Sequence, residues 1–128
     1  MDSVRAMTDV TGFGLIGHLL EMCGENFSSE LFYDKIKLIE GAKELAQKFV
    51  APDNTYRNWK SYDGKVSGIT GESLLTLCDP QTSGGLMVAV AAENKNEFSD
   101  WLNKKGFDKF SEPIGQIIKR NEFVITIK

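Results

Sequence analysis

Two segments of the chain combine glycines with the polar side chains that bind phosphates and metal ions. The first, residues 8–14, reads Thr-Asp-Val-Thr-Gly-Phe-Gly and opens an apolar helical pattern. A helix start offers unpaired N–H groups and the positive end of the helix dipole, so it attracts anions. Gly12 and Gly14 allow a ligand to approach the backbone closely, beside Thr11. Asp9 carries a hard carboxylate oxygen, which predicts a magnesium ligand next to bound phosphates.

Helix capping is the competing interpretation of this first segment. Thr8, Asp9 and Thr11 are residue types that cap helices by accepting a hydrogen bond from a backbone N–H group. Capping is the commoner role at such positions, and neighbouring residues can divide the two roles between them. The residues alone leave both interpretations open.

A dinucleotide-binding unit is a second alternative for the same stretch. Residues 12–17 match the Gly-x-Gly-x-x-Gly pattern, and Asp34 follows at a distance suited to a ribose-binding acid. Such a unit needs a buried strand leading into its first glycine. Residues 1–10 carry several polar and charged side chains and are a poor buried strand, so this alternative is disfavoured.

The second segment, residues 79–85, reads Asp-Pro-Gln-Thr-Ser-Gly-Gly and precedes an apolar run. Its hydroxyls, free amides and paired glycines predict an anion-binding concavity. A tight turn entering a strand is the alternative, because these residue types supply turns routinely. If the segment lines a ligand cleft, the predicted lining residues are Asp79, Thr82, Ser83, Gly84 and Gly85.

The remaining candidates for chemistry are weaker. His18 has no histidine or cysteine at ligand spacing, so we expect a surface or partner-facing helix residue. Rings and positive charges alternate from Tyr56 to Tyr62, as in single-strand binders, but the net charge argues against that role. Cys23 and Cys78 lie in apolar contexts without an activating neighbour, which predicts buried, reduced thiols rather than nucleophiles.

Alternating helices and strands must position the two segments. Apolar side chains at three- and four-residue spacing predict helices over residues 11–23, 38–50, 72–77 and 94–105. Apolar or alternating runs predict strands over residues 31–33, 85–90, 114–119 and 123–127, of which 85–90 is covered on both faces and the last two form a hairpin. Residues 51–71 are polar and without period, which predicts a long loop. Together these elements predict an α+β layered domain.

Length and composition limit the class of protein. The 128 residues suit one domain with one core, and 41% apolar and 26% charged residues are typical of a globular protein. A net charge of −3 argues against a nucleic-acid partner. No apolar run approaches the roughly 20 residues of a membrane span, so we expect no membrane partner. The two reduced thiols predict a cytoplasmic location.

The two segments together resemble the selenophosphate synthetase (selenide, water dikinase) family. Residues 8–19 resemble its Thr-Asp-Val-Thr-Gly-Phe-Gly…Gly-His-Leu signature, and residues 79–86 resemble its second C-terminal signature. Residues 41–46 and Arg57-Asn58 add weaker matches, and the resemblance runs from about Met7 to the end of the chain. The chain departs from the family at Asp53-Asn54, where glycines are usual.

The resemblance implies that residues 1–128 are the C-terminal domain of a longer two-domain enzyme. That enzyme makes selenophosphate, AMP and phosphate from selenide, ATP and water with Mg²⁺, and it is a homodimer. Its ATP site lies between the two domains, with Asp9 as a magnesium ligand and Thr11, Gly12 and Gly14 near the phosphates. The catalytic residues belong to the absent N-terminal domain, so none is expected here. The implied fold is an α/β sandwich of the aminoimidazole ribonucleotide synthetase C-terminal type, with helices packed on a mixed sheet.

Three other identities stay open on the sequence. One is a sister ATP-dependent synthetase or maturation enzyme of the same superfamily. The second is the dinucleotide-binding module described above, and the third is a non-catalytic interaction domain.

Overall fold

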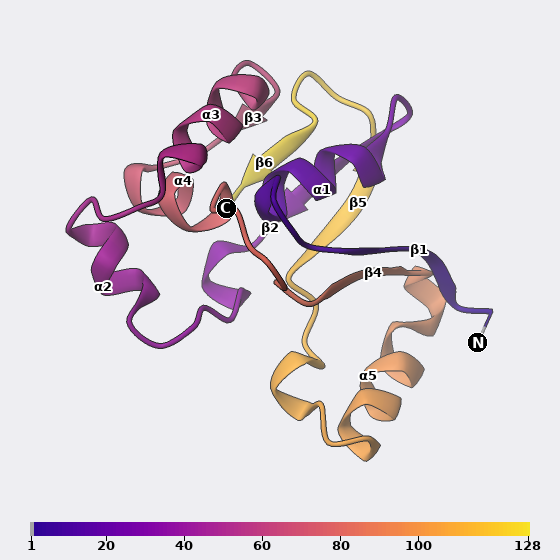
Figure 1. Ribbon diagram of the computed structural model, residues 1–128. Coiled ribbons are helices and arrows are strands. Elements are labelled where there is room, and N and C mark those ends of the chain that lie inside the picture. Colours follow the sequence, from indigo (N-terminus) through magenta and orange to yellow (C-terminus); the bar gives the residue numbers. More distant parts are fainter. Residues whose placement is uncertain (1) are drawn as a thin grey trace.

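The computed structural model describes residues 2–128, which form two sheets with helices around them (Figure 1). The helices are α1 (Gly14–Cys23), α2 (Ala42–Gln47), α3 (Asp53–Tyr62), α4 (Gly71–Leu77) and α5 (Lys95–Lys104). The strands are β1 (Val4–Asp9), β2 (Phe27–Leu31), β3 (Val66–Ser67), β4 (Leu86–Val90), β5 (Gly115–Lys119) and β6 (Ile125–Ile127). Short 3₁₀ turns occupy Tyr33–Lys35, Ala92–Asn94 and Asp108–Phe110. The predicted α+β class is confirmed.

The strands divide between two sheets of different kinds. β1 and β4 form an antiparallel pair, whereas the other four strands form a mixed sheet in the order β3-β6-β2-β5. In the larger sheet β2 is antiparallel to β5 and parallel to β6, and β3 is parallel to β6. A dinucleotide-binding unit would place β1 and β2 side by side in one parallel sheet. They lie in separate sheets, so that alternative is wrong.

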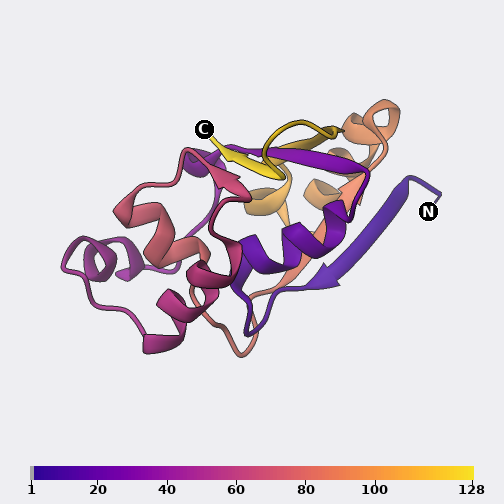
Figure 2. The same cartoon turned by 90° about the horizontal axis from the view of Figure 1, so that it is seen from above.

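Helix α1 lies between the two sheets and forms the centre of the core. It contacts β1 on one side and β2 and β6 on the other, and Figure 2 shows it between β1 and β2. Ile16, Leu19 and Cys23 are buried along it, as their spacing predicted. β1 alternates between half-buried and exposed residues, so it is a strand but not a buried one, in line with the prediction for residues 1–10. Met1 of that range lies outside the described residues.

The predicted loop over residues 51–71 is wrong. About half of it forms helix α3, and the short strand β3 follows. Thr55, Trp59 and Tyr62 recur at helical spacing, and Thr55 and Tyr62 are buried. The helical period is hidden in the sequence because the buried face of α3 includes polar and mixed residues instead of aliphatic ones.

The predicted hairpin at the C-terminus is also wrong. β5 and β6 do not pair with each other, because β2 lies between them and bonds to both. The strand predicted at residues 31–33 corresponds to β2, which ends at Leu31. The helix predicted over residues 38–50 is shorter in the structure, where only α2 is helical, and Phe49 just after it has a left-handed backbone with φ of 58°.

Burial differs from the sequence expectations in β4 and α5. β4 was expected to be covered on both faces, but it has one neighbouring strand and Leu86 is 68% exposed. Trp101 of α5 was expected to point inward and is 40% exposed. Among residues 2–128, no helix has the length and apolar character needed to cross a membrane.

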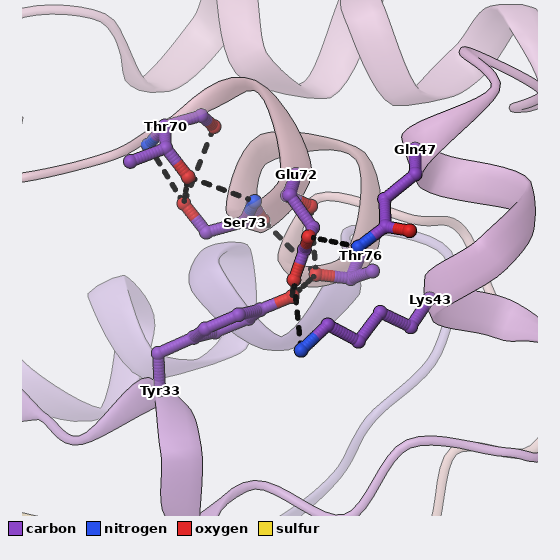
Figure 3. Close-up of polar contacts among 7 residues, drawn as sticks. All are labelled: Tyr33, Lys43, Gln47, Thr70, Glu72, Ser73 and Thr76. Atoms are coloured by element: carbon purple, nitrogen blue, oxygen red, sulfur yellow. Dashed lines mark hydrogen bonds and ion pairs between the residues drawn. The ribbon is translucent and has the colours of Figure 1, made fainter.

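A cluster of polar side chains connects α4 to α2 and to Tyr33 (Figure 3). Glu72 accepts hydrogen bonds from Gln47 Nε2 at 3.0 Å and from the Tyr33 hydroxyl at 3.2 Å, and it lies 3.6 Å from Lys43 Nζ. These bonds, with that of Gln47 as the largest influence, lower the pKa of the Glu72 carboxyl. Helix α4 itself begins with a capping box in which Thr70 and Ser73 exchange hydrogen bonds.

Candidate functional site

The two glycine-containing segments meet at one cavity. The cavity has a volume of about 170 Å³ and is lined by Asp9, Val10, Thr11, Thr82, Ser83, Gly84, Gly85 and Leu86. We call residues 8–14 the first motif and residues 79–85 the second motif. Asp9 ends β1 opposite Leu86, the first residue of β4, so the antiparallel pair brings the motifs together.

Backbone hydrogen bonds join the motifs beyond the end of the β1–β4 pair. Val10 N donates to Gly85 O at 2.9 Å, and Gly84 N donates to Val10 O at 2.8 Å. Gln81 N donates to Thr11 O at 3.1 Å. The second motif is therefore not a free turn, because its backbone is paired along the first motif.

Two glycines are required where the backbones approach most closely. A Cβ atom on Gly84 would lie 2.8 Å from Val10 O, and one on Gly14 would lie 2.8 Å from both the Cys78 carbonyl carbon and Leu77 O. Gly14 also has φ of +71°, a conformation that other residues adopt only with strain. Gly14 and Gly84 thus allow the motifs, and the end of α4, to pack in contact.

Three predicted site residues do not line the cavity. Gly14 is buried against Cys78, and Gly12 is exposed beside it with its carbonyl group in a hydrogen bond. Asp79 is half-buried, and burial raises the pKa of its carboxyl group. The cavity is lined by the other predicted residues, which are Asp9, Thr11, Thr82, Ser83, Gly84 and Gly85.

The capping interpretation of the first motif is wrong. Helix α1 begins at Gly14 with Phe13 as the N-cap residue, and no side chain caps it. Thr8 Oγ1 donates to the carbonyl oxygen of Asp9, and Thr11 Oγ1 shares a 3.2 Å hydrogen bond with His18 Nε2. Asp9 therefore lies at the cavity without a capping role.

His18 is buried within the domain, whereas a surface or partner-facing position was predicted for it. It is 7% exposed because α1 has the two sheets and α3 and α4 around it. Its Nε2 holds the hydroxyl of Thr11, which lines the cavity, while Nδ1 lies 3.5 Å from Glu21 Oε2 without a hydrogen-bond partner in residues 2–128. His18 therefore fixes the orientation of a cavity side chain.

Sequence reasoning missed two residues that hold the motifs in place. Asn58 donates to the carbonyl oxygens of Gly12 and Cys78, and the hydroxyl of Tyr62 donates to Phe13 O at 2.8 Å. Both belong to α3, which the sequence had presented as a loop. The weak resemblance at Arg57-Asn58 was the one signal that pointed to this region.

The cavity fits a magnesium ion held partly by groups from outside these residues. Asp9 is exposed and, among residues 2–128, forms no ion pair, so its carboxylate is available. Thr11, Thr82 and Ser83 add hydroxyl oxygens, which suit a hard cation. Nowhere in residues 2–128 do three or more His, Cys, Asp or Glu side chains gather as a complete metal site. Magnesium commonly uses one or two carboxylates, with phosphates and water as its other ligands.

Both cysteines are buried and free, as predicted. Burial raises the pKa of the Cys78 thiol to about 12, and burial also raises the pKa of Cys23. At neutral pH both are therefore protonated thiols, which are poor nucleophiles.

The fold and the two joined motifs define a known class of domain. Residues 1–128 match the family described as AIR synthase related protein, C-terminal domain. The chain therefore belongs to this family.

Within the family, the chain is similar to proteins named selenide, water dikinase. It is 43% identical over 129 residues to the one from Haemophilus influenzae strain 86-028NP, covering 100% of this chain and 37% of the relative. The protein of Pasteurella multocida is 45% identical over 95 residues, which are 73% of this chain and 27% of the relative. That of Pseudomonas putida is 40% identical over 128 residues, or 99% of this chain and 37% of the relative.

These relatives confirm the resemblance that the two motifs indicated. The chain spans about 37% of the length of curated relatives such as those from Haemophilus and Pseudomonas.

Proposed function

We propose that the chain is the C-terminal part of an ATP-dependent selenophosphate synthetase. The complete enzyme converts selenide, ATP and water to selenophosphate, AMP and phosphate. The chain contributes one wall of a site for ATP and Mg²⁺ that it shares with an N-terminal domain, and it is not catalytic alone. The observation that carries the proposal is the meeting of Asp9 with residues 82–85 at one cavity, and the relatives named selenide, water dikinase support it.

The role proposed for Asp9 is to hold Mg²⁺ on the phosphates of ATP. Its carboxylate is exposed at the cavity and carries no competing ion pair within residues 2–128. Bound Mg²⁺ supplies the charge neutralisation on which phosphoryl transfer depends. Thr11 is held in place by His18, so it presents its hydroxyl to the phosphates in a fixed orientation. Gly12 and Gly14 shape the backbone beside it.

The second motif is proposed to contact the same phosphates from the other side of this cavity. Thr82 and Ser83 are exposed at the cavity and offer hydroxyl groups that can donate to phosphate oxygens. Asp79, half-buried and outside the cavity lining, has the weaker claim to a direct role.

A further domain is part of the proposal because the cavity is incomplete as a nucleotide site. Its volume of about 170 Å³ is smaller than the roughly 300–1,000 Å³ of small-molecule sites. Among residues 2–128, no lysine or arginine lines it, so positive charge for a triphosphate has to come from elsewhere. The relatives, of which this chain covers 37%, are long enough to contain such a domain.

The test is the selenide-dependent release of AMP from ATP by the complete gene product. We expect Asp9→Asn to raise the Mg²⁺ concentration for half-maximal rate by about tenfold or more, since removing even a supporting group of a metal site costs about 10–100-fold in affinity. Asp100→Asn is the control, because Asp100 is an exposed acid on α5 outside the cavity lining. Normal activity and normal Mg²⁺ dependence in Asp9→Asn would remove the metal assignment.

A sister ATP-dependent synthetase is the second candidate, since the family description covers AIR synthase related proteins. The same assay separates the two functions, because ATP turnover that does not respond to selenide favours the sister enzyme.

We place the enzyme in the cytoplasm, where free thiols such as Cys23 and Cys78 persist. The homodimer implied by the resemblance stays a prediction, which light scattering on the complete gene product can check.

A further inference from the structure

Helix α3 joins the two motifs through a single side chain. Asn58 Nδ2 donates to Gly12 O and to Cys78 O, both at 2.9 Å. Gly12 belongs to the first motif, and Cys78 directly precedes the second. An asparagine amide nitrogen carries two N–H groups, so both of its donors are used in this bridge.

We propose that Asn58 is a positioning residue that sets the separation between the two walls of the cavity. Its amide holds the first motif beside the start of the second, and it thereby fixes where Asp9 stands relative to Thr82 and Ser83. The consequence for ATP and Mg²⁺ rests on the proposed function, whereas the consequence for the cavity geometry does not.

The position of the bridge explains why a donor is needed there. Two carbonyl oxygens that lie within 2.9 Å of one nitrogen converge on the same point, where their partial negative charges repel each other without a donor between them. Cys78 is fully buried, so its carbonyl group has little access to a replacement water. At the Cys78 carbonyl, a water molecule is therefore a poor substitute for the Asn58 amide.

The Asn58 bridge lies at the end of the paired backbone stretch that is farthest from the β1–β4 sheet. From Gly12 and Cys78 the backbone bonds continue outward through Thr11 with Gln81, and then through Val10 with Gly84 and Gly85. Loss of the Asn58 bridge leaves these bonds without a restraint at the Gly12 and Cys78 end, because the regular pairing of β1 with β4 lies at the other end, beyond Val10 and Gly85.

The same helix reinforces the first motif one turn further along. Tyr62, four residues after Asn58, donates its hydroxyl to Phe13 O. Residues four apart lie on one helix face, so α3 presents both donors to the first motif at once. Of the two residues, Asn58 also bonds to Cys78, which directly precedes the second motif.

The experiment compares Asn58→Ala and Asn58→Asp with the parent protein, using the complete gene product. Alanine removes both N–H donors together with the side-chain volume. Aspartate keeps the shape of asparagine, lacks both donors and adds a negative charge next to the two carbonyl oxygens, so its effect should be at least as large. Ser61→Ala is the control, because the Ser61 hydroxyl donates to Arg57 O within α3 and is exposed. The first readout is hydrogen exchange of individual backbone amides.

We expect the amides of Gln81 and Gly84 to exchange about tenfold faster or more in both Asn58 variants. A typical hydrogen bond is worth about fivefold in an equilibrium constant, and two are lost. The amides of β5, in the other sheet, should keep their rates. Unchanged exchange at Gln81 and Gly84 overturns the inference, and so does an equal acceleration in β5, which marks global destabilisation. If Asn58→Asp does not fold, Asn58→Ala alone decides.

The second readout is the KM for ATP in the selenide-dependent AMP assay. We expect it to rise about tenfold in both Asn58 variants and to stay unchanged in Ser61→Ala. A purely structural role would lower the amount of folded enzyme and hence the maximal rate, with KM unchanged, and that result overturns the role of Asn58 in the site. A parent protein without selenide-dependent activity rejects the proposed function, while the exchange readout still decides on the bridge.

Discussion

Gly14 offers a quantitative test of how the first motif packs on the end of α4. An added Cβ atom would lie 2.8 Å from the carbonyl carbon of Cys78 and from Leu77 O, and 3.0 Å from Cys78 Cα. All three are backbone atoms, so no side-chain rotation can relieve the contact. Gly14 also has φ of +71°, which alanine adopts only with strain.

The expected cost of Gly14→Ala is the sum of these two effects. A left-handed backbone costs a non-glycine residue about 1–2 kcal/mol, and overpacking a tight site costs about 1–3 kcal/mol. Together they lower the free energy of unfolding by about 2–5 kcal/mol, a large part of the roughly 5–15 kcal/mol typical of a domain. With a urea slope of about 2 kcal/mol per molar, the midpoint should fall by about 1–2.5 M.

The assay is urea unfolding followed by circular dichroism, with Gly12→Ala as the matched control from the same motif. A Cβ atom on Gly12 would meet no atom within 4 Å, and Gly12 has no positive φ, so its replacement should stay within about 0.5 kcal/mol. If the two variants unfold at the same urea concentration, then Gly14 is not held against Cys78 and this account of the motif packing is refuted.

Two further predictions concern the supporting structure. The pKa of Glu72 is lowered in the folded state, so its stabilisation is present above its unfolded pKa of about 4.3 and is lost as the pH falls through the folded value. Glu72→Gln should therefore lose less stability on acidification than the parent chain, as measured by urea midpoints at pH 6 and about pH 3; parallel losses would contradict this. Thr55 is fully buried and its hydroxyl has no hydrogen-bond partner in residues 2–128, so Thr55→Val should raise the unfolding free energy by about 1 kcal/mol in the same assay. A lower midpoint would mean that the hydroxyl does have a partner.

Helices with a regular spacing of apolar residues were the predictable part of the fold. The spacing of Ile16, Leu19 and Cys23 identified α1, and the pattern over residues 94–105 identified α5 nearly to its ends. Helix α3 was missed because its buried positions include Thr55, whose polarity gives no hydrophobic period. The C-terminal strands were assigned to a hairpin because the sequence of β5 and β6 has that pattern. In the structure β2 lies between them, and this pairing joins segments that are far apart in the sequence.

For the candidate site too, the sequence predicted the residues that local motifs identify and missed those whose role depends on distant segments. Asp9, Thr11 and residues 82–85 were found from their types and their motifs. His18 was misplaced because its burial depends on the sheets on either side of α1. Asn58 was missed because its two bonds reach residues 46 and 20 positions away along the chain.

By itself, the sequence determined the α+β class, the two glycine-containing motifs and the family they indicate, because residue type, short-range period and motif spacing are local properties. Only the tertiary structure decided that β1 and β4 pair, that the two motifs therefore share one cavity, and that α3 bridges them through Asn58. The physical reason is that strand partners and buried polar bonds depend on which distant segments compete for the same hydrogen-bonding groups. No single segment of the chain contains that information.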